Sequence, residues 1–142
     1  MPLVRDTMST EVKLMHPDRT VTEAAETMKN FDVGALPIVE EDKVVGMLTD
    51  RDIAVRVVAE GKSPGSIKIR DAMTSEVGYC YDDQDVQEVA QVMRDKAIRR
   101  VVVMDRDDNL VGMCSLGDLA AKHDETKAGK VLDDIARKPA DK

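Results

Sequence analysis

The chain has 142 residues, and its 21 basic and 28 acidic side chains give a formal net charge of −7. Hydrophobic residues make up 42% of the chain, charged residues 35% and aromatic residues 2%, which is typical of a globular domain but not of a base-stacking platform. The acidic balance argues against a nucleic-acid partner, because phosphate backbones are bound by clustered Lys and Arg. No apolar run approaches the roughly 18 residues of a membrane span, and no signal peptide is visible. We therefore expect a cytoplasmic protein without a membrane partner.

Cysteine and histidine are scarce. Cys80 and Cys114 are the two cysteines, and without a CxxC motif they favour reduced thiols over a disulfide. His16 and His123 are the two histidines, which excludes a histidine-rich metal site and leaves few catalytic bases. Asp82, Asp83 and Asp85 lack the Gly and distal Glu of a calcium loop, so they indicate a solvated turn. No metal site is expected.

An internal repeat organises the chain. Residues 4–9 (Val-Arg-Asp-Thr-Met-Ser) return at 69–74 as Ile-Arg-Asp-Ala-Met-Thr, an offset of 65. After one inserted residue the offset becomes 66, which aligns 46–49 with 112–115. A register held over roughly 50 positions with one slip indicates a tandem duplication. We predict a first copy at 4–60, a linker at 61–68, a second copy at 69–122 and a tail at 123–142. In the tail, one face of a short helix is indicated by Val131, Leu132 and Ile135.

Each copy predicts the element order β-α-β-β-α, an α/β (α+β) fold. An extended segment, residues 11–15 in the first copy, precedes a helix. The helix begins at a capping-box pattern, Thr20-x-x-Glu23 or Asp85-x-x-Glu88. Behind these caps the predicted buried stripes are Val21, Ala24, Ala25 and Met28 in the first copy, and Val86, Val89, Ala90 and Met93 in the second. Two strands joined by a charged turn follow at 35–48 and 100–114, and a second helix opens at Thr49 or Ser115.

The sharpest motif is the start of the second helix in each copy. Thr49-x-x-Asp52 and Ser115-x-x-Asp118 each place a hydroxyl three residues before a carboxylate. Taken alone, such a pattern predicts a helix cap in which the two residues bond to each other's backbone. A hydroxyl and a carboxylate at this spacing can also hydrogen-bond a diol. The residues by themselves leave both interpretations open.

The surrounding pattern resembles a known family. An apolar strand, a Gly and the Thr/Ser-x-x-Asp ending recur after each β-α-β block, as in the cystathionine β-synthase (CBS) domain, and the tandem pair resembles a Bateman module. Residues 35–39 (Ala-Leu-Pro-Ile-Val) and 49–53 (Thr-Asp-Arg-Asp-Ile) are similar to those of stand-alone bacterial members. The resemblance covers residues 4–122. It implies two repeats about a pseudo-two-fold axis, two equivalent clefts, a homodimer, and an adenosine-containing ligand such as AMP, ADP, ATP or S-adenosylmethionine.

The family pattern assigns the first cleft to Ser115 and Asp118, with Asp118 holding the ribose hydroxyls. Arg99 and Arg51 are its expected phosphate contacts. Its base contacts are expected from the first copy, around Val12, Leu14, Val33, Gly34, Ala35 and Pro37. No required cofactor is implied.

The second cleft, by the same resemblance, uses Thr49 and Asp52. Its base contacts are expected from the second copy, at Val77, Tyr79, Ile98 and Val102. Gly34 and Gly117 occupy the positions that match Arg99 and Arg51, so this cleft lacks their charges. Arg100 is a candidate for either cleft. We therefore expect a nucleotide to bind the Asp118 cleft more tightly.

These observations favour a regulatory nucleotide sensor over an enzyme, because no nucleophile, base and orienting group come together in the sequence. Its output would pass through dimer geometry or an effector protein. Apolar helix residues Ile53, Val57, Leu119 and Met28 are predicted to form the homodimer surface. A structural dimer with vestigial clefts and a small adenylate-processing hydrolase are the alternatives. Ligand-induced stabilisation and turnover of ATP distinguish them.

Overall fold

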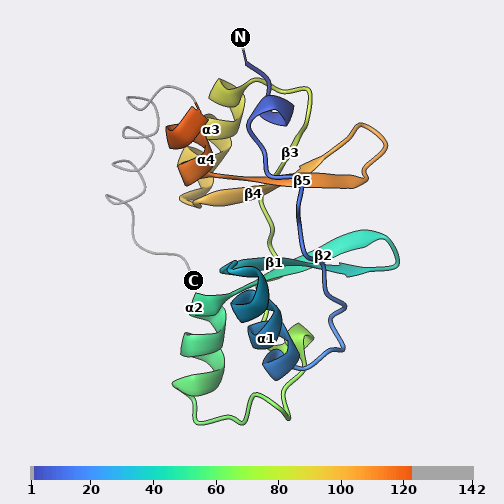
Figure 1. The fold of residues 1–142 in the computed structure, drawn as a ribbon, viewed down its shortest axis with the longest axis vertical. Coiled ribbons are helices and arrows are strands. Elements are labelled where there is room, and N and C mark those ends of the chain that lie inside the picture. The colour runs from blue at the N-terminus through green and yellow to red at the C-terminus, as the bar shows by residue number, and fades with distance from the viewer. Residues whose placement is uncertain (1, 123–142) are drawn as a thin grey trace. The chain divides into compact units, whose positions relative to one another are not determined.

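The computed structural model describes residues 2–122, so the predicted tail helix lies outside the described residues (Figure 1). The chain forms two compact units that do not coincide with the two sequence copies. Within the described residues, the first unit is Val12–Val77, and the second unit combines 2–11 with 78–122. Each copy's opening segment therefore packs with the other copy's helices and strands.

The first unit is built around an antiparallel hairpin with its helices on one face of the sheet (Figure 1). Its elements are α1 (Val21–Phe31), β1 (Ala35–Glu40), β2 (Lys43–Thr49), α2 (Asp50–Ile53), the π-helical turn η2 (Ala54–Val58) and the 3₁₀ turn η3 (Ile69–Asp71). The register runs from Ala35 opposite Thr49 to Glu40 opposite Lys43. A core forms from Val21, Ala24, Met28, Leu36, Ile38, Leu48, Val57, Ile69 and Ala72.

The second unit repeats this plan with an additional strand. Its elements are the 3₁₀ turn η1 (Val4–Asp6), β3 (Tyr79–Tyr81), α3 (Val86–Lys96), β4 (Arg100–Met104), β5 (Leu110–Ser115) and α4 (Leu116–Lys122). β3 is parallel to β4, and β4 is antiparallel to β5. Its core contains Val4, Cys80, Val86, Val89, Ala90, Met93, Val101, Val103, Cys114 and Leu119. The duplicated α+β architecture is confirmed.

The exchanged opening segments bind the sheets through matched backbone contacts. Thr74 exchanges two 2.9 Å backbone hydrogen bonds with Met47 on β2. Ser9 makes the equivalent pair with Met113 on β5, at 2.8 and 2.9 Å. Gly46 and Gly112 permit this approach, because an added Cβ would lie 2.9 Å from the Thr74 carbonyl oxygen or 2.7 Å from that of Ser9.

Several local predictions were wrong. Residues 11–15 form no strand, and Met15 makes only a single bridge to Ile38. Pro17 follows two residues later and has no N–H with which to extend the pairing. Ala25 is exposed rather than part of the buried stripe. Asp85 caps α3, but Glu88 does not complete a capping box, because its carboxylate accepts a hydrogen bond from the Gln84 side chain. The Thr20–Glu23 box is confirmed.

The predicted dimer residues were also wrong in this role. Val57, Leu119 and Met28 are buried in their own units, and Ile53 packs partly against the core of the first unit. They already have apolar neighbours and need no second chain. Among the described residues, the exposed large apolar side chains are instead Leu14, Phe31, Val55, Val58 and Tyr79.

Both cysteines are buried thiols of the second unit. Burial raises the pKa of the Cys80 thiol from 9.0 to about 12, so it is protonated at neutral pH. The expectation of a buried, reduced Cys114 is confirmed.

Candidate functional site

The two helix starts share one geometry. The Asp52 backbone N–H donates to Thr49 Oγ1 at 3.1 Å, and Thr49 N–H donates to Asp52 Oδ2 at 3.0 Å. In the second unit, the Asp118 N–H donates to Ser115 Oγ at 3.0 Å, and Ser115 N–H donates to Asp118 Oδ2 at 2.8 Å. Both motifs are therefore helix caps, and any ligand must use the atoms that the caps leave over.

In the first unit, the remaining oxygen of Asp52 is already engaged. Thr74 Oγ1 donates to Asp52 Oδ1 at 3.3 Å, and Arg56 Nη1 lies 3.8 Å from the same oxygen. Arg56 Nη1 also donates to the carbonyl oxygens of Ala72 and Met73, at 3.0 and 2.8 Å. The Asp52 side chain is only 8% exposed. Asp52 therefore ties the segment 72–74 to α2 and η2.

In the second unit, the corresponding oxygen is available. Asp118 is half-buried, and within residues 2–122 its carboxylate has no polar partner other than the Ser115 N–H. Ser9 occupies the repeat position of Thr74 but makes no side-chain hydrogen bond to Asp118 in the described part of the chain. Asp118 Oδ1 can thus accept hydrogen bonds from a ligand.

Two arginines flank the start of α4, the helix that carries Asp118. Leu116 N–H at the start of α4 donates to the Arg99 carbonyl oxygen at 2.8 Å, and Arg100 lies opposite Ser115 in the β4–β5 register. Arg99 is exposed and Arg100 half-buried. No carboxylate in the described residues pairs with either guanidinium. Both charges are available to an anion.

The first unit has the opposite charge at the equivalent place. Asp50 N–H donates to the Gly34 carbonyl oxygen at 3.0 Å, so Gly34 matches Arg99 and Asp50 matches Leu116 in three dimensions. A Cβ on Gly34 would lie 2.9 Å from Asp50 Oδ2, which occupies the space beside the glycine. A phosphate arriving here would meet a carboxylate rather than two guanidinium groups.

Comparison with known proteins agrees with this duplicated plan. The sequence model of the CBS domain matches residues 4–59 and 69–124. The chain belongs to the CBS domain family.

Relatives of this CBS pair extend over nearly its whole length. It is 39% identical to the CBS domain-containing protein YhcV of Bacillus subtilis over 96% of each chain. The structure of the CBS domain protein TA0289 of Thermoplasma acidophilum matches with a TM-score of 0.84 and 25% identity, covering 96% of this chain and 77% of that one. The CBS domain pair of MJ0100, solved with 5-methylthioadenosine and S-adenosyl-L-methionine, matches with a TM-score of 0.75 and 32% identity, covering 84% and 97%. Proteins of this kind are regulatory modules.

The predicted site residues of the CBS pair fall into two groups. The second unit brings together Ser115, Asp118, Arg99 and Arg100 at one end of the β4–β5 hairpin, and it also carries Tyr79 and Ile98. The first unit carries Arg51, Thr49, Asp52, Val33, Gly34, Ala35, Pro37 and Val77. Cleft assignments that combine residues of both units stay predictions.

The exposure of individual side chains refines these assignments. Arg51 is exposed on α2, and none of the described residues pairs with its guanidinium. Tyr79 is 54% exposed and meets Tyr81 edge to face, with 5.8 Å between ring centroids. Pro37 is buried, whereas Val33 and Ile98 are partly buried against the cores of their units.

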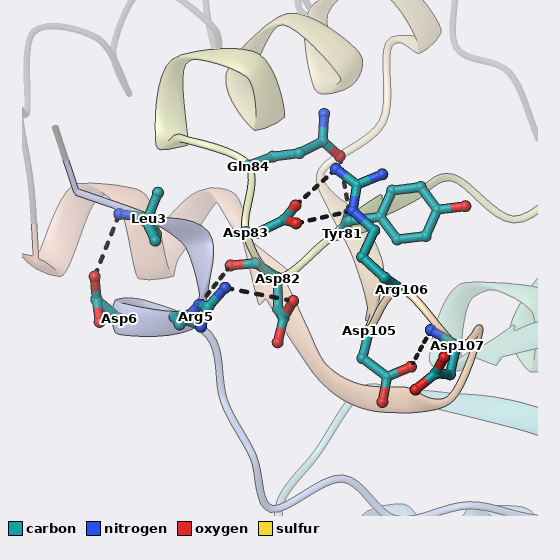
Figure 2. Close-up of polar contacts among 10 residues, drawn as sticks. All are labelled: Leu3, Arg5, Asp6, Tyr81, Asp82, Asp83, Gln84, Asp105, Arg106 and Asp107. Carbon is teal, nitrogen blue, oxygen red and sulfur yellow. Dashed lines mark hydrogen bonds and ion pairs between the residues drawn. The ribbon is translucent and has the colours of Figure 1, made fainter.

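Sequence reasoning missed the residues that occupy Asp52. Thr74 belongs to a repeated Met-Ser/Thr pair, and its match with Ser9 concealed a difference in hydrogen bonding. Arg56 lies one helical turn after Asp52, which is the spacing of a helical ion pair and was a signal that could have been used. The turn at 82–85 is solvent-exposed at Asp83, as predicted, but sequence reasoning missed its ion pairs, which join Arg106 to Asp83 and Arg5 to Asp82 (Figure 2).

No helix within residues 2–122 has the length and apolar character to cross a membrane. The cytoplasmic location stays a prediction.

Proposed function

We propose that this CBS pair is a regulatory module without catalytic activity that binds an adenine nucleotide or a related adenosyl ligand at Asp118. The observation that carries the proposal concerns residues 2–122: there the second Asp118 carboxylate oxygen has no polar partner, and no carboxylate pairs with Arg99 or Arg100 near the same helix start. The adenosyl ligands in the structure of the related MJ0100 pair support this ligand class.

The side chains suit the two ends of a nucleotide. A carboxylate oxygen accepts hydrogen bonds from the two hydroxyl groups of a ribose, which is a neutral diol. Guanidinium groups bind phosphate oxygens through charge-assisted and often bidentate hydrogen bonds. In the proposed complex Asp118 holds the ribose, Arg99 holds the phosphates and Arg100 adds charge. The contacts that the family resemblance assigns to Arg51, Val33, Gly34, Ala35 and Pro37 belong to the first unit and stay predictions.

The Asp52 cleft is proposed to be weak or vestigial for nucleotides. A ribose there would have to displace Thr74 and Arg56 from Asp52, and its phosphates would approach Asp50. A ligand with less negative charge than a nucleotide would suit Asp52 better. The base contacts assigned to this cleft at Val77, Tyr79 and Ile98 stay predictions, because Tyr79 and Ile98 belong to the second unit. The internal contacts of Asp52 favour the alternative of a purely structural role for one of the two clefts.

The signal is proposed to leave the module through homodimer geometry or an effector protein. A ligand shifts such an equilibrium only by its preference for one arrangement. Light scattering at tens of micromolar, roughly where a dimer of micromolar affinity is populated, should give the dimer mass. A monomer mass with and without AMP would contradict the homodimer.

Calorimetry on the full chain, stripped of nucleotide, tests the binding site. Asp118→Ala should weaken AMP and adenosine together, because it removes the ribose contact. Arg99→Ala should weaken AMP by about 1.5–3 kcal/mol, roughly tenfold to 150-fold, and leave adenosine nearly unchanged. Asp52→Ala is the matched control and should retain the AMP affinity of the wild type in this CBS pair.

Two results would contradict the proposal. If Asp52→Ala abolishes AMP binding while Asp118→Ala retains the affinity of the wild type, the assignment of the clefts is reversed. If AMP, ADP, ATP and S-adenosylmethionine neither bind nor stabilise the wild type, the structural alternative holds. Incubation with ATP should release no product, and turnover would favour the hydrolase.

A further inference from the structure

A second cluster of polar side chains lies in the first unit, away from Asp52. His16 precedes Pro17 in the connection to α1, Asp18 follows it, and Glu40 ends β1. One ligand atom from each of the three lies within 4.8 Å of the others. His16 Nε2 is 3.7 Å from Glu40 Oε2, and His16 Nδ1 is 3.9 Å from Asp18 Oδ2.

Arg70 of η3 now joins the two carboxylates. Its Nη2 lies 2.9 Å from Asp18 Oδ1 and 3.0 Å from Glu40 Oε2, and its Nε donates to Asp18 Oδ1 at 2.9 Å. The cluster is therefore arranged around a single cationic group. The side chains of His16, Asp18, Glu40 and Arg70 are between 34% and 49% exposed, so each can change its rotamer without disturbing the core.

We propose that His16, Asp18 and Glu40 bind a divalent transition-metal ion of the zinc type, in competition with the Arg70 guanidinium. One imidazole and two carboxylates form a ligand set that suits Zn²⁺, whereas Mg²⁺ and Ca²⁺ prefer oxygen ligands alone. Zinc bonds of about 2.1 Å in a tetrahedron place ligand atoms about 3.4 Å apart. His16 Nδ1 already accepts the Asp18 backbone N–H at 3.1 Å, so the metal would bind Nε2, and one ligand atom from each residue lies within 4.8 Å of the others before any exposed side chain moves.

The metal and Arg70 exclude each other because both need Asp18 and Glu40. Metal binding would remove the ion pairs of Arg70 with Asp18 and Glu40, while the Ile69 side chain of η3 would stay in the core of the first unit. The backbone bonds from Ile69 N–H to the Arg19 carbonyl oxygen and from Arg70 N–H to the Pro17 carbonyl oxygen, both 2.9 Å, would remain. The metal is therefore expected to loosen η3 without unfolding the unit.

The second unit provides an internal control. At the offset of 65 residues, Tyr81 stands in place of His16, with Asp83 and Asp105 in place of Asp18 and Glu40. Asp83 is bound by Arg106, at 2.8 and 2.7 Å, and the Tyr81 ring lies under the same guanidinium. A phenol does not replace an imidazole as a neutral ligand, so one metal ion per chain is expected.

Titration of the metal-free full chain with Zn²⁺ by calorimetry, and with Co²⁺ by absorption, tests the proposal. The wild type should bind one ion, and His16→Ala and Glu40→Gln should each weaken binding at least about tenfold. Arg70→Gln should strengthen binding severalfold, because it removes the competing cation. Arg106→Gln and His123→Ala are controls and should bind like the wild type.

Circular dichroism should show the wild-type fold in every variant. If one of the two variants at metal ligands, His16→Ala or Glu40→Gln, fails to fold, the other still tests the proposal. The proposal is overturned if the wild type binds no Zn²⁺, if His16→Ala and Glu40→Gln both bind it normally, or if Arg70→Gln binds it more weakly. A cobalt–thiolate absorption band would also overturn it, because the ion would then lie on the cysteines.

Discussion

The two units show how one duplicated motif acquires two roles. Thr49–Asp52 and Ser115–Asp118 make the same pair of hydrogen bonds between backbone N–H groups and side-chain oxygens. Their lengths are 3.0 and 3.1 Å in the first unit and 2.8 and 3.0 Å in the second. The first unit uses the second oxygen of its carboxylate internally, whereas in the second unit none of the described residues donates to that oxygen. The repeat thus determines the helix cap, and the neighbouring residues determine whether a ligand can use it.

The charges around the two helix starts also suit a ligand better in the second unit than in the first. Arg99 and Arg100 flank the start of α4, whereas Gly34, Ala35 and the Asp50 carboxylate flank the start of α2. A motif that matches in both copies would assign two equivalent nucleotide sites. The surrounding charges and hydrogen bonds instead favour one anion site per chain, in the second unit.

The largest expected effect on stability concerns Gly46 and Gly112, the glycines against which the exchanged opening segments pack. Gly46→Ala and Gly112→Ala each place a Cβ against a backbone carbonyl oxygen and a methionine sulfur. Overpacking of this kind costs about 1–3 kcal/mol. Urea unfolding should show the loss, and hydrogen exchange should place it in the first unit for Gly46→Ala and in the second for Gly112→Ala.

Gly65→Ala is the matched control, because its nearest neighbour is 3.7 Å away, at an ordinary van der Waals distance. It should unfold like the wild type. Equal protection of both units in the Gly46→Ala and Gly112→Ala variants would contradict the tight approach of the exchanged segments.

The next effect concerns stability, for which the two aspartates should rank in the opposite order from the one proposed for ligand affinity. Asp52→Ala removes a buried carboxylate, which deprives the Thr74 hydroxyl of its acceptor and leaves Arg56 only its two carbonyl acceptors, so it should destabilise the protein by about 1–3 kcal/mol. Asp118→Ala removes one backbone contact of a half-buried residue and should cost about 0.5–1.5 kcal/mol. Urea midpoints without ligand measure both. A larger cost for Asp118→Ala would break the division into a structural and a binding carboxylate.

The sequence predicted those parts of the fold and the site that depend on local pattern. The repeat register located Asp52 and Asp118 at equivalent helix starts, and Thr20 and Asp85 at the first helices. It also identified Arg99 as the counterpart of Gly34, which the bonds to Leu116 and Asp50 bear out.

The remaining features depend on contacts between distant residues. A repeat looks the same whether its opening segment packs on its own copy or on the other, so the exchange of the segments with Ser9 and Thr74 could not be read from the register. The cluster of His16, Asp18 and Glu40 could not be predicted from the sequence either, because the fold brings together residues from before α1 and from the end of β1.

A smaller effect tests the hydrogen bond that occupies Asp52. Thr74→Val removes the hydroxyl that donates to Asp52 Oδ1, and a bond of this kind contributes about 0.5–1.5 kcal/mol. Ser9→Val at the matching position should cost less, because the exposed Ser9 hydroxyl has no such bond. The difference between the two urea midpoints is the measurement, and equal values would mean that Thr74 does not distinguish the units.

The smallest effect concerns the ion pair that the second unit has gained in its charged turn. Arg106 binds Asp83 through two hydrogen bonds over the Tyr81 ring (Figure 2). The hydrogen bond from Arg106 holds the pKa of Asp83 below its usual 3.8. Stability from this pair is therefore present above pH 3.8 and is lost as the pH falls through the lowered pKa. Arg106→Gln should lower the urea midpoint slightly at pH 7, because an exposed pair contributes little, and the difference from the wild type should shrink as the pH falls below 3.8 and Asp83 becomes protonated. Lys29→Gln, an exposed charge on α1, is the control and should show no such pH dependence. A difference for Arg106→Gln that grows on acidification would show that Arg106 stabilises the turn by packing on Tyr81 rather than by its charge.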